Sequence, residues 1–313
     1  MQTGLAHKYL FGPVASRRLG RSLGVDLLPF KTCTLDCVYC ECGRTTTLTT
    51  ERAAFVPVND VLAELAEWLK SGGTADFITL AGSGEPTLHT GLAEVLRGIR
   101  ALTNIPTCLL TNGTLFHLPE VRAAAALADV VVPSLDAPDP LTFARINRPA
   151  PGVDFDAYLQ GLRTFAAEYR GALWLEIFIV PGINDSPECI RALAAQAAEL
   201  HPAKIQLNTA VRPPAESFVR PATPAQLAAI APQFTPPAEV IASFRATLHE
   251  QTSVALDEVL QLVRRRPCTV HDVAHGLSIS FSAARAALTE LSSRGAVIRE
   301  VHAGLEFYRA PGA

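Results

Sequence analysis

The chain has 313 residues, of which 49% are hydrophobic and 18% charged, and its formal net charge is −3. This composition predicts a globular interior, leaves room for one large domain and a small one, and argues against indiscriminate binding to polyanions. No apolar run reaches the roughly 18 residues that a membrane span needs, and the first residues lack the layout of a secretory signal. We therefore expect a cytoplasmic protein with no membrane association.

Apolar runs alternate with amphipathic segments through the first two thirds of the chain. The apolar runs predict strands at 22–28, 76–80, 106–111, 130–137, 172–180 and 204–211. The amphipathic segments predict helices at 57–70, 91–103, 118–128, 155–169 and 186–200. Asn59 or Asp60 is expected to cap the first of these helices, and Ser186, followed by Pro187, the last. Residues 138–152 are predicted to form a long loop.

Near-continuous apolar strands separated by helices indicate a parallel sheet with both faces covered. A closed eightfold barrel needs about 250 residues, whereas the alternation here takes roughly 190. The expected fold class is therefore α/β, with a partial (βα)6 TIM-type barrel over residues 1–245 that is closed by the proline-rich segment 211–237. In such barrels the functional groups gather at the C-terminal ends of the strands.

Residues 249–313 follow a different pattern. Three helices, at 256–266, 269–277 and 280–295, precede two short strands joined by a turn. This order predicts a small winged helix-turn-helix domain. The third helix is thinly basic, with Arg285 and Arg294, and the one basic cluster is 264–266. Nucleic-acid binding is possible on this pattern, but we favour protein contact or intramolecular docking.

Four of the seven cysteines lie in the stretch KTCTLDCVYCECG. Cysteines that are odd in number and this crowded make a poor disulfide framework, and in a reducing cytosol they more often bind metal. Cys33, Cys37 and Cys40 form a C-x3-C-x2-C pattern, which favours an iron–sulfur cluster with one open iron over zinc or redox-active thiols. The cysteines outside this stretch are expected to be core thiols: Cys108, Cys189 and Cys268.

The cysteine pattern resembles the radical S-adenosylmethionine (SAM) superfamily, in which SAM chelates the open iron of a [4Fe–4S] cluster. The motif of that superfamily needs three cysteines, so the resemblance implies that Cys42 is not a ligand. The segment GSGEP at 82–86 is similar to the glycine-rich element of that superfamily, with Ser83 where many members carry glycine. Its glycines let backbone carbonyls approach the ammonium group of the ligand, and Glu85 can add a charge-assisted contact. Asp136 suits a loop cap equally well, and Gly182 an ordinary turn. The resemblance implies that the cofactors are a [4Fe–4S] cluster and SAM, and that these residues contact SAM: Tyr39, Gly82, Ser83, Gly84, Glu85, Pro86, Asn112, Ser134, Asp136, Gly182 and Asn208.

Longer segments, among them FGPVASRRLGRSLGVDLLPF, TNGTL, FARINRP and IQLNTAVRPPAE, resemble the wyosine-synthetase-like subgroup over residues 9–220. Wyosine synthetases rebuild a methylated guanosine in tRNA with pyruvate and carry upstream cysteines for a second cluster. No cysteine precedes Cys33, so the second cluster is expected to be absent. The resemblance implies an enzyme that cleaves SAM to a 5′-deoxyadenosyl radical and abstracts hydrogen from a substrate. That substrate is left open among an RNA nucleoside, a peptide or protein, and a small metabolite.

The sequence assigns no catalytic side chain. Lys31 and Arg44 flank the cysteine loop and are expected either to tune a cluster or to be solvated. A reductant such as flavodoxin or ferredoxin is an expected partner. An anionic substrate is expected at basic side chains near the barrel mouth, with surface solvation as the alternative: Arg17, Arg18, Arg21, Arg145 and Arg148. The rival function is an iron–sulfur DNA-binding regulator, which would need a cluster but no SAM-binding element.

Overall fold

The computed structural model describes residues 8–241, 256–277, 279–302 and 304–311. Its main sheet runs in the order β1-β2-β5-β6-β7-β8-β9-β10. At one edge β1 (Leu10–Ser16) pairs antiparallel with β2, and at the other β10 (Glu239–Val240) pairs parallel with β9. Between them lie the six parallel strands that were predicted: β2 (Gly20–Val25), β5 (Phe77–Leu80), β6 (Thr107–Thr111), β7 (Val130–Pro133), β8 (Ala172–Phe178) and β9 (Lys204–Asn208).

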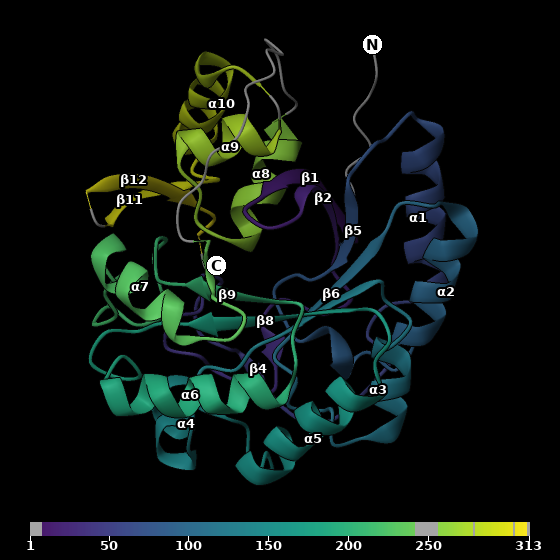
Figure 1. Ribbon diagram of the computed structural model, residues 1–313. Helices are drawn as coiled ribbons and strands as arrows, with labels where there is room; N and C mark the ends of the chain where they lie inside the picture. Colours follow the sequence, from purple (N-terminus) through teal and green to yellow (C-terminus); the bar gives the residue numbers. More distant parts are fainter. Residues whose placement is uncertain (1–7, 242–255, 278, 303, 312–313) are drawn as a thin grey trace.

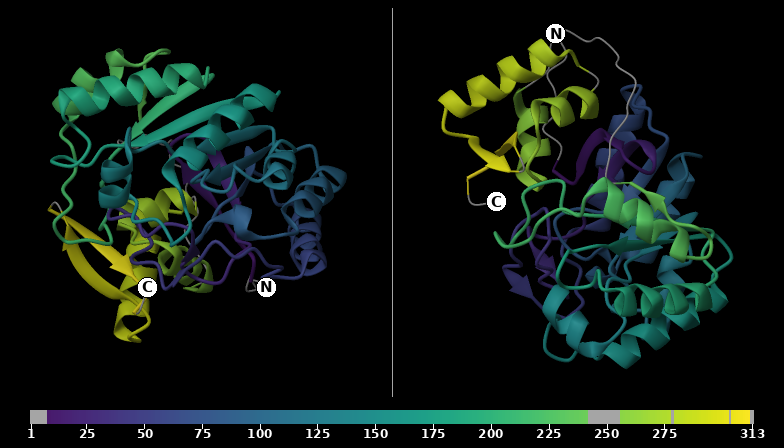
Figure 2. Two further views of the ribbon diagram at one scale, coloured as in Figure 1. Left: turned by 90° about the horizontal axis from the view of Figure 1, so that it is seen from below. Right: turned by 60° about the vertical axis from the view of Figure 1, so that its left-hand side comes forward.

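Helices cover the outer face of this curved sheet (Figures 1 and 2). They are α1 (Val58–Lys70), α2 (Leu92–Leu102), α3 (Pro119–Ala125), α4 (Pro140–Ile146), α5 (Phe155–Glu168), α6 (Pro187–Glu199) and α7 (Pro224–Ile230), with short 3-10 turns η1 (Pro86–Leu88) and η2 (Ala231–Gln233). A mostly parallel sheet with this cover is the expected α/β architecture of a partial TIM-type barrel. No helix among the described residues is long and apolar enough to cross a membrane.

A separate apolar cluster fills the inside of the sheet at the N-terminal ends of its strands. Leu19, in the turn between β1 and β2, packs there with Cys108 of β6 and with Val130 and Val132 of β7. Phe77 and other partly buried side chains pack against this cluster. This cluster fills one end of the barrel interior, or lumen. Polar side chains can therefore line the lumen only at the opposite end, where the parallel strands end.

Two helices lie where no helix was predicted. The segment 138–152 is not a continuous loop, because it contains α4, which begins at Pro140 after Asp139 accepts a hydrogen bond from Thr142 N at 2.9 Å. The proline-rich segment contains α7, which begins directly after the N-cap residue Thr223. Both starts combine a capping side chain with a proline in the first turn.

The predicted caps of two other helices have different outcomes. Ser186 caps α6 by accepting a hydrogen bond from Cys189 N, as predicted. The prediction for α1 is wrong, because this helix already begins at Val58 and no side chain caps it.

The C-terminal module comprises the described residues between 256 and 311. Its predicted helices and hairpin are present as α8 (Leu256–Arg265), α9 (Val270–Gly276), α10 (Phe281–Ser293), β11 (Ile298–His302) and β12 (Leu305–Arg309). The module sits against the β1–β2 hairpin, where Val14 belongs to the same buried cluster as Val259, Leu262 and Val273 (Figures 1 and 2). Helices α8 and α9 therefore pack on β1.

Candidate functional site

The cysteine stretch follows β2 at the end of the barrel where the parallel strands finish. Cys33 ends the short strand β3 (Thr32–Cys33), which pairs with β4 (Thr47–Leu48). Backbone hydrogen bonds from Asp36 N to Asn147 O, 3.0 Å, and from Val38 N to Ile146 O, 2.9 Å, fix the stretch to the end of α4. All seven cysteines are free thiols.

Each cysteine of the C-x3-C-x2-C pattern has its own side-chain N–H donor. The donor-to-sulfur distances are 3.6 Å from Asn112 Nδ2 to Cys33 Sγ, 3.4 Å from Asn147 Nδ2 to Cys37 Sγ and 3.1 Å from Lys31 Nζ to Cys40 Sγ. N–H donors around sulfur stabilise negative charge on thiolate ligands. Sequence reasoning missed Asn147, although it lies within the quoted segment FARINRP.

The three thiols differ in acidity. Burial raises the pKa of Cys33 to about 12 and that of Cys37 well above its usual range. A hydrogen bond from Cys42, together with the charge of Lys31, lowers the pKa of Cys40 to about 5 in spite of its burial. Buried thiols become thiolates when bound iron supplies the compensating positive charge.

Among the described residues, Cys42 has no side-chain N–H donor of the kind that each of the other three has, and besides its hydrogen bond to Cys40 it approaches the glycine segment. Its sulfur lies 4.0 Å from the carbonyl oxygen of Gly82. Within the described parts of the chain, no three His, Cys, Asp or Glu side chains converge on a point that could hold one metal ion. A cubane cluster binds each cysteine at a different iron, so its ligands need not converge in this way.

The glycines of GSGEP allow close contact with the surrounding chain. A Cβ on Gly82 would lie 2.1 Å from Asp26 Cγ, and a Cβ on Gly84 would lie 2.1 Å from the carbonyl oxygen of Thr32. Asp26 directly follows β2 and accepts hydrogen bonds from Ser83 N and Oγ, each 3.2 Å. The glycine segment is thereby fixed between the end of the first barrel strand and the cysteine stretch.

Glu85 does not extend toward an open site. Its carboxylate is buried and accepts hydrogen bonds from Thr111 Oγ1 at 2.6 Å, from Asn112 N at 2.7 Å and from both N and Oγ1 of Thr87. Both oxygens are engaged by the protein itself and Glu85 lies outside the lining of the cavity described below, so its contact with the ligand stays a prediction. Pro86 begins the η1 turn that follows.

Tyr39 and Asp136 form one buried unit. The Tyr39 ring stacks on Phe178 with 3.8 Å between centroids, and its hydroxyl donates to Asp136 Oδ2. Asp136 also accepts from Phe178 N at 2.8 Å and from Asn147 Nδ2 at 2.9 Å. Burial raises the pKa of Asp136 to about 6 although these donors oppose the shift. The unit links the cysteine stretch to the ends of β7 and β8.

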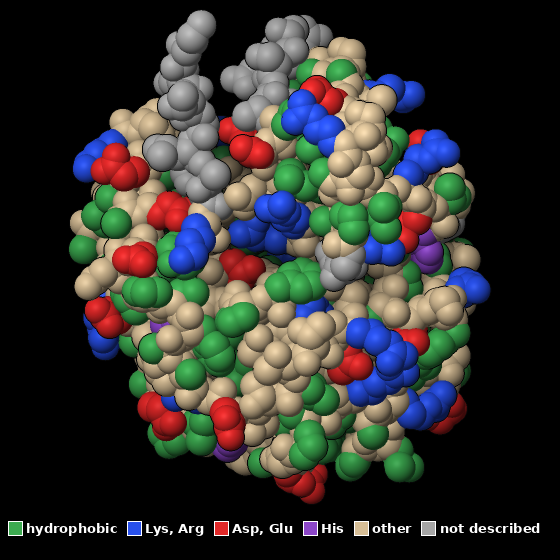
Figure 3. Space-filling model, turned by 180° about the vertical axis from the view of Figure 1, so that it is seen from behind, with side chains coloured by type: hydrophobic (Ala, Val, Ile, Leu, Met, Phe, Trp, Pro, Cys, Tyr) green, Lys and Arg blue, Asp and Glu red, His purple; other side chains and the backbone are tan. Residues whose placement is uncertain are grey.

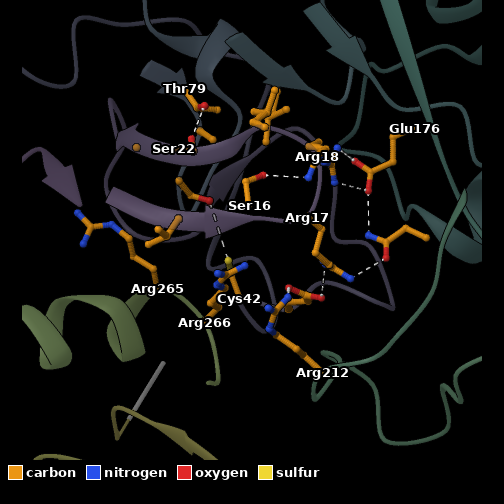
Figure 4. Close-up of a pocket in the computed structure, with 18 of the residues that line it drawn as sticks. Ser16, Arg17, Arg18, Ser22, Cys42, Thr79, Glu176, Arg212, Arg265 and Arg266 are labelled. Carbon is orange, nitrogen blue, oxygen red and sulfur yellow. Dashed lines mark hydrogen bonds and ion pairs between the residues drawn. The ribbon is translucent and has the colours of Figure 1, made fainter. Parts of the chain in front are cut away.

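A cavity of about 310 Å³ opens beside the cysteine stretch (Figure 4). Four of the predicted SAM contacts line it: Tyr39, Gly82, Ser134 and Asn208. The other seven lie outside its lining: Ser83, Gly84, Glu85, Pro86, Asn112, Asp136 and Gly182. Gly182 is farther along the loop after β8, where its N donates to Asp185 Oδ1 at 2.7 Å.

The structure separates the five arginines that were predicted together. Arg17 and Arg18 line the cavity and point into it (Figure 4). Arg21 donates to Thr74 at the other end of the sheet, Arg145 to the carbonyl of Gly182, and Arg148 pairs with Glu216, all outside the cavity lining. Lys31 is buried at the cysteine stretch, whereas Arg44 is exposed and pairs with Glu216.

Residues that the sequence did not single out complete the cavity. Arg212 follows β9 and reaches Glu41 at 3.0 Å and Asp272 of α9 at 2.9 Å. Arg265 and Arg266, at the end of α8, also line the cavity. In the space-filling view of Figure 3, basic side chains likewise gather around a hollow.

Residues 27–193 match the family model described as the Radical SAM superfamily. The chain belongs to the radical SAM superfamily. Members use a [4Fe–4S] cluster and SAM, so this radical SAM protein is an enzyme with these cofactors. The residues present fit them, because three thiols on one loop, each with its own N–H donor, lie beside a cavity at the end of the barrel.

Several relatives of this radical SAM enzyme carry the name UPF0026, which states no reaction. A UPF0026 protein of Helicobacter pylori J99 is 33% identical over 96% of this chain and 97% of its own length. A second, slr1464 of Synechocystis, is 38% identical over 65% of this chain and 76% of its own length, and the chain also belongs to this UPF0026 family. A protein of Brachyspira hyodysenteriae named GTPase Obg is 33% identical over 97% of this chain, which spans 45% of that relative.

Solved radical SAM structures share the fold. A radical SAM methyltransferase from Sphaerobacter thermophilus aligns with a TM-score of 0.54 at 17% identity, covering 70% of this chain and 65% of its own. TYW1, solved with a lysine-pyruvate adduct bound, aligns with a TM-score of 0.51 at 15% identity, covering 73% of this chain and 76% of its own. At these identities the likeness shows the fold and not the substrate.

Proposed function

We propose that this enzyme holds its cluster through Cys33, Cys37 and Cys40 and binds SAM at the iron that has no cysteine. The observation that carries this proposal is the set of three N–H donors, one for each sulfur, beside the cavity. When bound, the cluster and SAM supply a 5′-deoxyadenosyl radical that abstracts hydrogen from the substrate. Cys42 stays outside the ligand set.

The chain's own residues would bind, orient and shield the reactants. Ser134 and Asn208 offer polar side chains to the cavity, and Gly82 offers a backbone carbonyl suited to an ammonium group. The stacked rings of Tyr39 and Phe178 form a flat wall of the same cavity. Glu85 and Asp136 would act indirectly, because Glu85 holds the glycine segment in place and Asp136 holds Tyr39.

Several finer assignments belong to this proposal. The placement in the wyosine-synthetase-like subgroup rests on the sequence segments that resemble it, and it does not name the substrate. A flavodoxin or ferredoxin would donate the electron, which fits a cytoplasmic location. The order of three helices and a hairpin supports a winged helix-turn-helix assignment for the C-terminal module.

No observation favours the alternative, a DNA-binding iron–sulfur regulator. The exposed face of α10 offers Arg285, while Arg294 at its end pairs with Glu290 of the same helix. Within the basic cluster 264–266, Arg265 and Arg266 line the barrel cavity. Duplex binding usually requires a marked positive outer face, which these placements do not supply.

The test is SAM cleavage by the anaerobically reconstituted full chain. With dithionite and SAM, the enzyme is expected to form 5′-deoxyadenosine and methionine, measured by liquid chromatography and mass spectrometry. Cys37→Ala should abolish both the iron–sulfur absorbance and 5′-deoxyadenosine. Cys189→Ala is the matched control, because this half-buried thiol lies in α6 and should leave both readouts unchanged. Absence of 5′-deoxyadenosine from the reconstituted wild type would refute the proposed function.

A further inference from the structure

One wall of the cavity beside the cysteines comes from the C-terminal module. Leu262 and Arg265 of α8, and Arg266 just after it, line this cavity together with barrel residues. Three more arginines line it from the barrel side: Arg17, Arg18 and Arg212. The module therefore contributes directly to the space next to the predicted cluster.

Two of these five arginines are matched by a carboxylate of their own. Arg18 makes a bidentate pair with Glu176 of β8, with distances of 2.8 and 2.9 Å. Arg265 lies 3.8 Å from Asp26 and stacks over the Phe11 ring at 4.4 Å. Each pair has a net charge of zero, so Arg18 and Arg265 add no positive charge to the cavity.

The other three arginines surround Glu41. Arg212 reaches Glu41 at 3.0 Å and Asp272 at 2.9 Å, and Arg17 lies 3.4 Å from Glu41. Among the described residues, no hydrogen bond or ion pair engages the guanidinium of Arg266. Three guanidinium groups thus face two carboxylates, which leaves one positive charge in excess. The buried Nε of Arg212 also has no hydrogen-bond partner within the described parts of the chain.

Electrostatics agree with this excess of positive charge. Burial, together with the neighbouring charges of Arg212 and Arg266, lowers the pKa of Arg17 to about 10 although Glu41 opposes the shift. Arg212 and Arg17 lie 3.0 and 3.4 Å from Glu41, and Arg266 lines the same cavity. Two cations are therefore already engaged with this carboxylate, and the third remains for a second anion.

A second cavity of about 270 Å³ adjoins the first. The two cavities share Glu41, Cys42, Arg265 and Arg266 in their linings. The second cavity is bordered further by Arg44, Arg309 and Glu300. Arg266 thus stands where the two spaces meet, next to the cysteine stretch.

We propose that Arg266, with Arg17 and Arg212, binds one carboxylate or phosphate group of the substrate. The C-terminal module is then part of the substrate site, and it selects a small anionic molecule or an anionic chain end. Guanidinium groups bind such oxyanions with two parallel N–H donors. That the bound anion is a substrate rests on the proposed function, whereas the anion site itself does not.

The experiment titrates oxyanions into the reconstituted full chain without reductant. Inorganic phosphate and acetate are each added at constant ionic strength with chloride as the balancing salt, and binding is followed by isothermal calorimetry. Arg266→Gln is compared with Arg264→Gln, which removes the same charge from the exposed neighbouring residue in α8. Arg266→Lys keeps the charge and removes the bidentate fork. Thermal unfolding checks that each variant is folded.

We expect saturable binding of at least one anion to the wild type, and the tighter of the two identifies a phosphate or a carboxylate ligand. Arg266→Gln should weaken that binding about tenfold or more, Arg266→Lys should lie between, and Arg264→Gln should stay within about twofold. The inference is overturned if neither anion saturates, or if Arg266→Gln binds like the wild type. Equal weakening by Arg264→Gln would also overturn it.

A final arm repeats the titration with SAM present. If SAM abolishes anion binding, the site belongs to the SAM carboxylate and the substrate assignment is overturned. If binding persists, the anion site is distinct from the SAM site. Failure of the proposed function is separately visible, because it appears as absence of 5′-deoxyadenosine from the wild type whatever the calorimetry shows.

Discussion

Lys31 Nζ lies 3.1 Å from the sulfur of Cys40, at the end of a side chain that is 2% exposed. Burial disfavours the charged ammonium, but the neighbouring thiolates more than offset this and raise the Lys31 pKa. The two residues therefore form a buried, charge-assisted contact. In the proposed holoenzyme this contact would place a positive charge against one cluster ligand.

Replacing Lys31 by Met is expected to lower the reduction potential of the cluster. A charge-assisted N–H···S contact favours the reduced, more negative cluster, so its loss should shift the potential downward by on the order of 50 mV. Potentiometric titration followed by electron paramagnetic resonance measures the shift. Arg44→Gln is the control, because Arg44 flanks the same loop but is 66% exposed and pairs with Glu216. A Lys31→Met potential equal to that of the wild type would contradict the assigned contact.

Cys42→Ala is expected to retain the cluster. Its sulfur faces the Gly82 carbonyl, and the three cysteines of the motif suffice as ligands. Iron and sulfide content per chain and the visible absorbance should match the wild type, whereas Cys33→Ala should lose them. If Cys42→Ala loses iron as Cys33→Ala does, Cys42 is a ligand and the assigned set is wrong.

Glu85→Ala is expected to lower the free energy of unfolding by about 3 kcal/mol. The substitution leaves the buried donors of Thr87, Thr111 and Asn112 without their acceptor. Urea unfolding of the cluster-free protein measures the change. Glu67→Ala on α1 removes a carboxylate of an exposed pair with Lys70 and should change stability by less than about 0.5 kcal/mol. Similar losses for both variants would contradict the positioning role of Glu85.

Asp272 should make the stability of the cluster-free protein depend on pH below about 5. Burial opposes its ionisation, but Arg212 and the Thr269 N–H lower its pKa from 3.8 to about 2. The folded state therefore binds fewer protons, so this contribution is present above pH 3.8 and is lost as the pH falls toward 2. The full contribution is about 2 kcal/mol, of which about half should be lost by pH 3.

Urea unfolding between pH 6 and pH 3 measures this dependence. Asp272→Asn should have a smaller decrease in stability over that range than the wild type. Asp156→Asn, an exposed residue of α5, changes the net charge equally and should leave the Asp272 contribution in place. An unchanged slope in Asp272→Asn would show that the link to Arg212 does not contribute as described.

The sequence predicted the elements whose signals are local. Six strands alternating with helices could be read from apolar periodicity, and the three motif cysteines from their spacing. The start of α4 carries an equally local signal, Asp139 followed by Pro140, but the density of proline and aspartate in this segment also favours a loop. The start of α7, Thr223 followed by Pro224, likewise lies in a proline-rich segment that favours a loop.

The electrostatic part of the site could not be predicted. Glu41, Arg212 and Asp272 lie far apart in the chain and meet only because α9 packs beside the loop after β9. Arg17 and Arg148 look alike in sequence, but one points into the lumen and the other pairs with Glu216. Which charged groups face each other depends on the tertiary arrangement of the strand ends, and periodicity carries no information about that.

The packing of Val14 with the C-terminal module has a consequence for biosynthesis. β1 is made long before α8 and α9, whose side chains bury Val14. Domains form as the chain emerges, and contacts between distant segments form late. The cavity wall that α8 supplies therefore forms only after the barrel strands have been made, so the cysteine stretch lies open on that side until α8 docks.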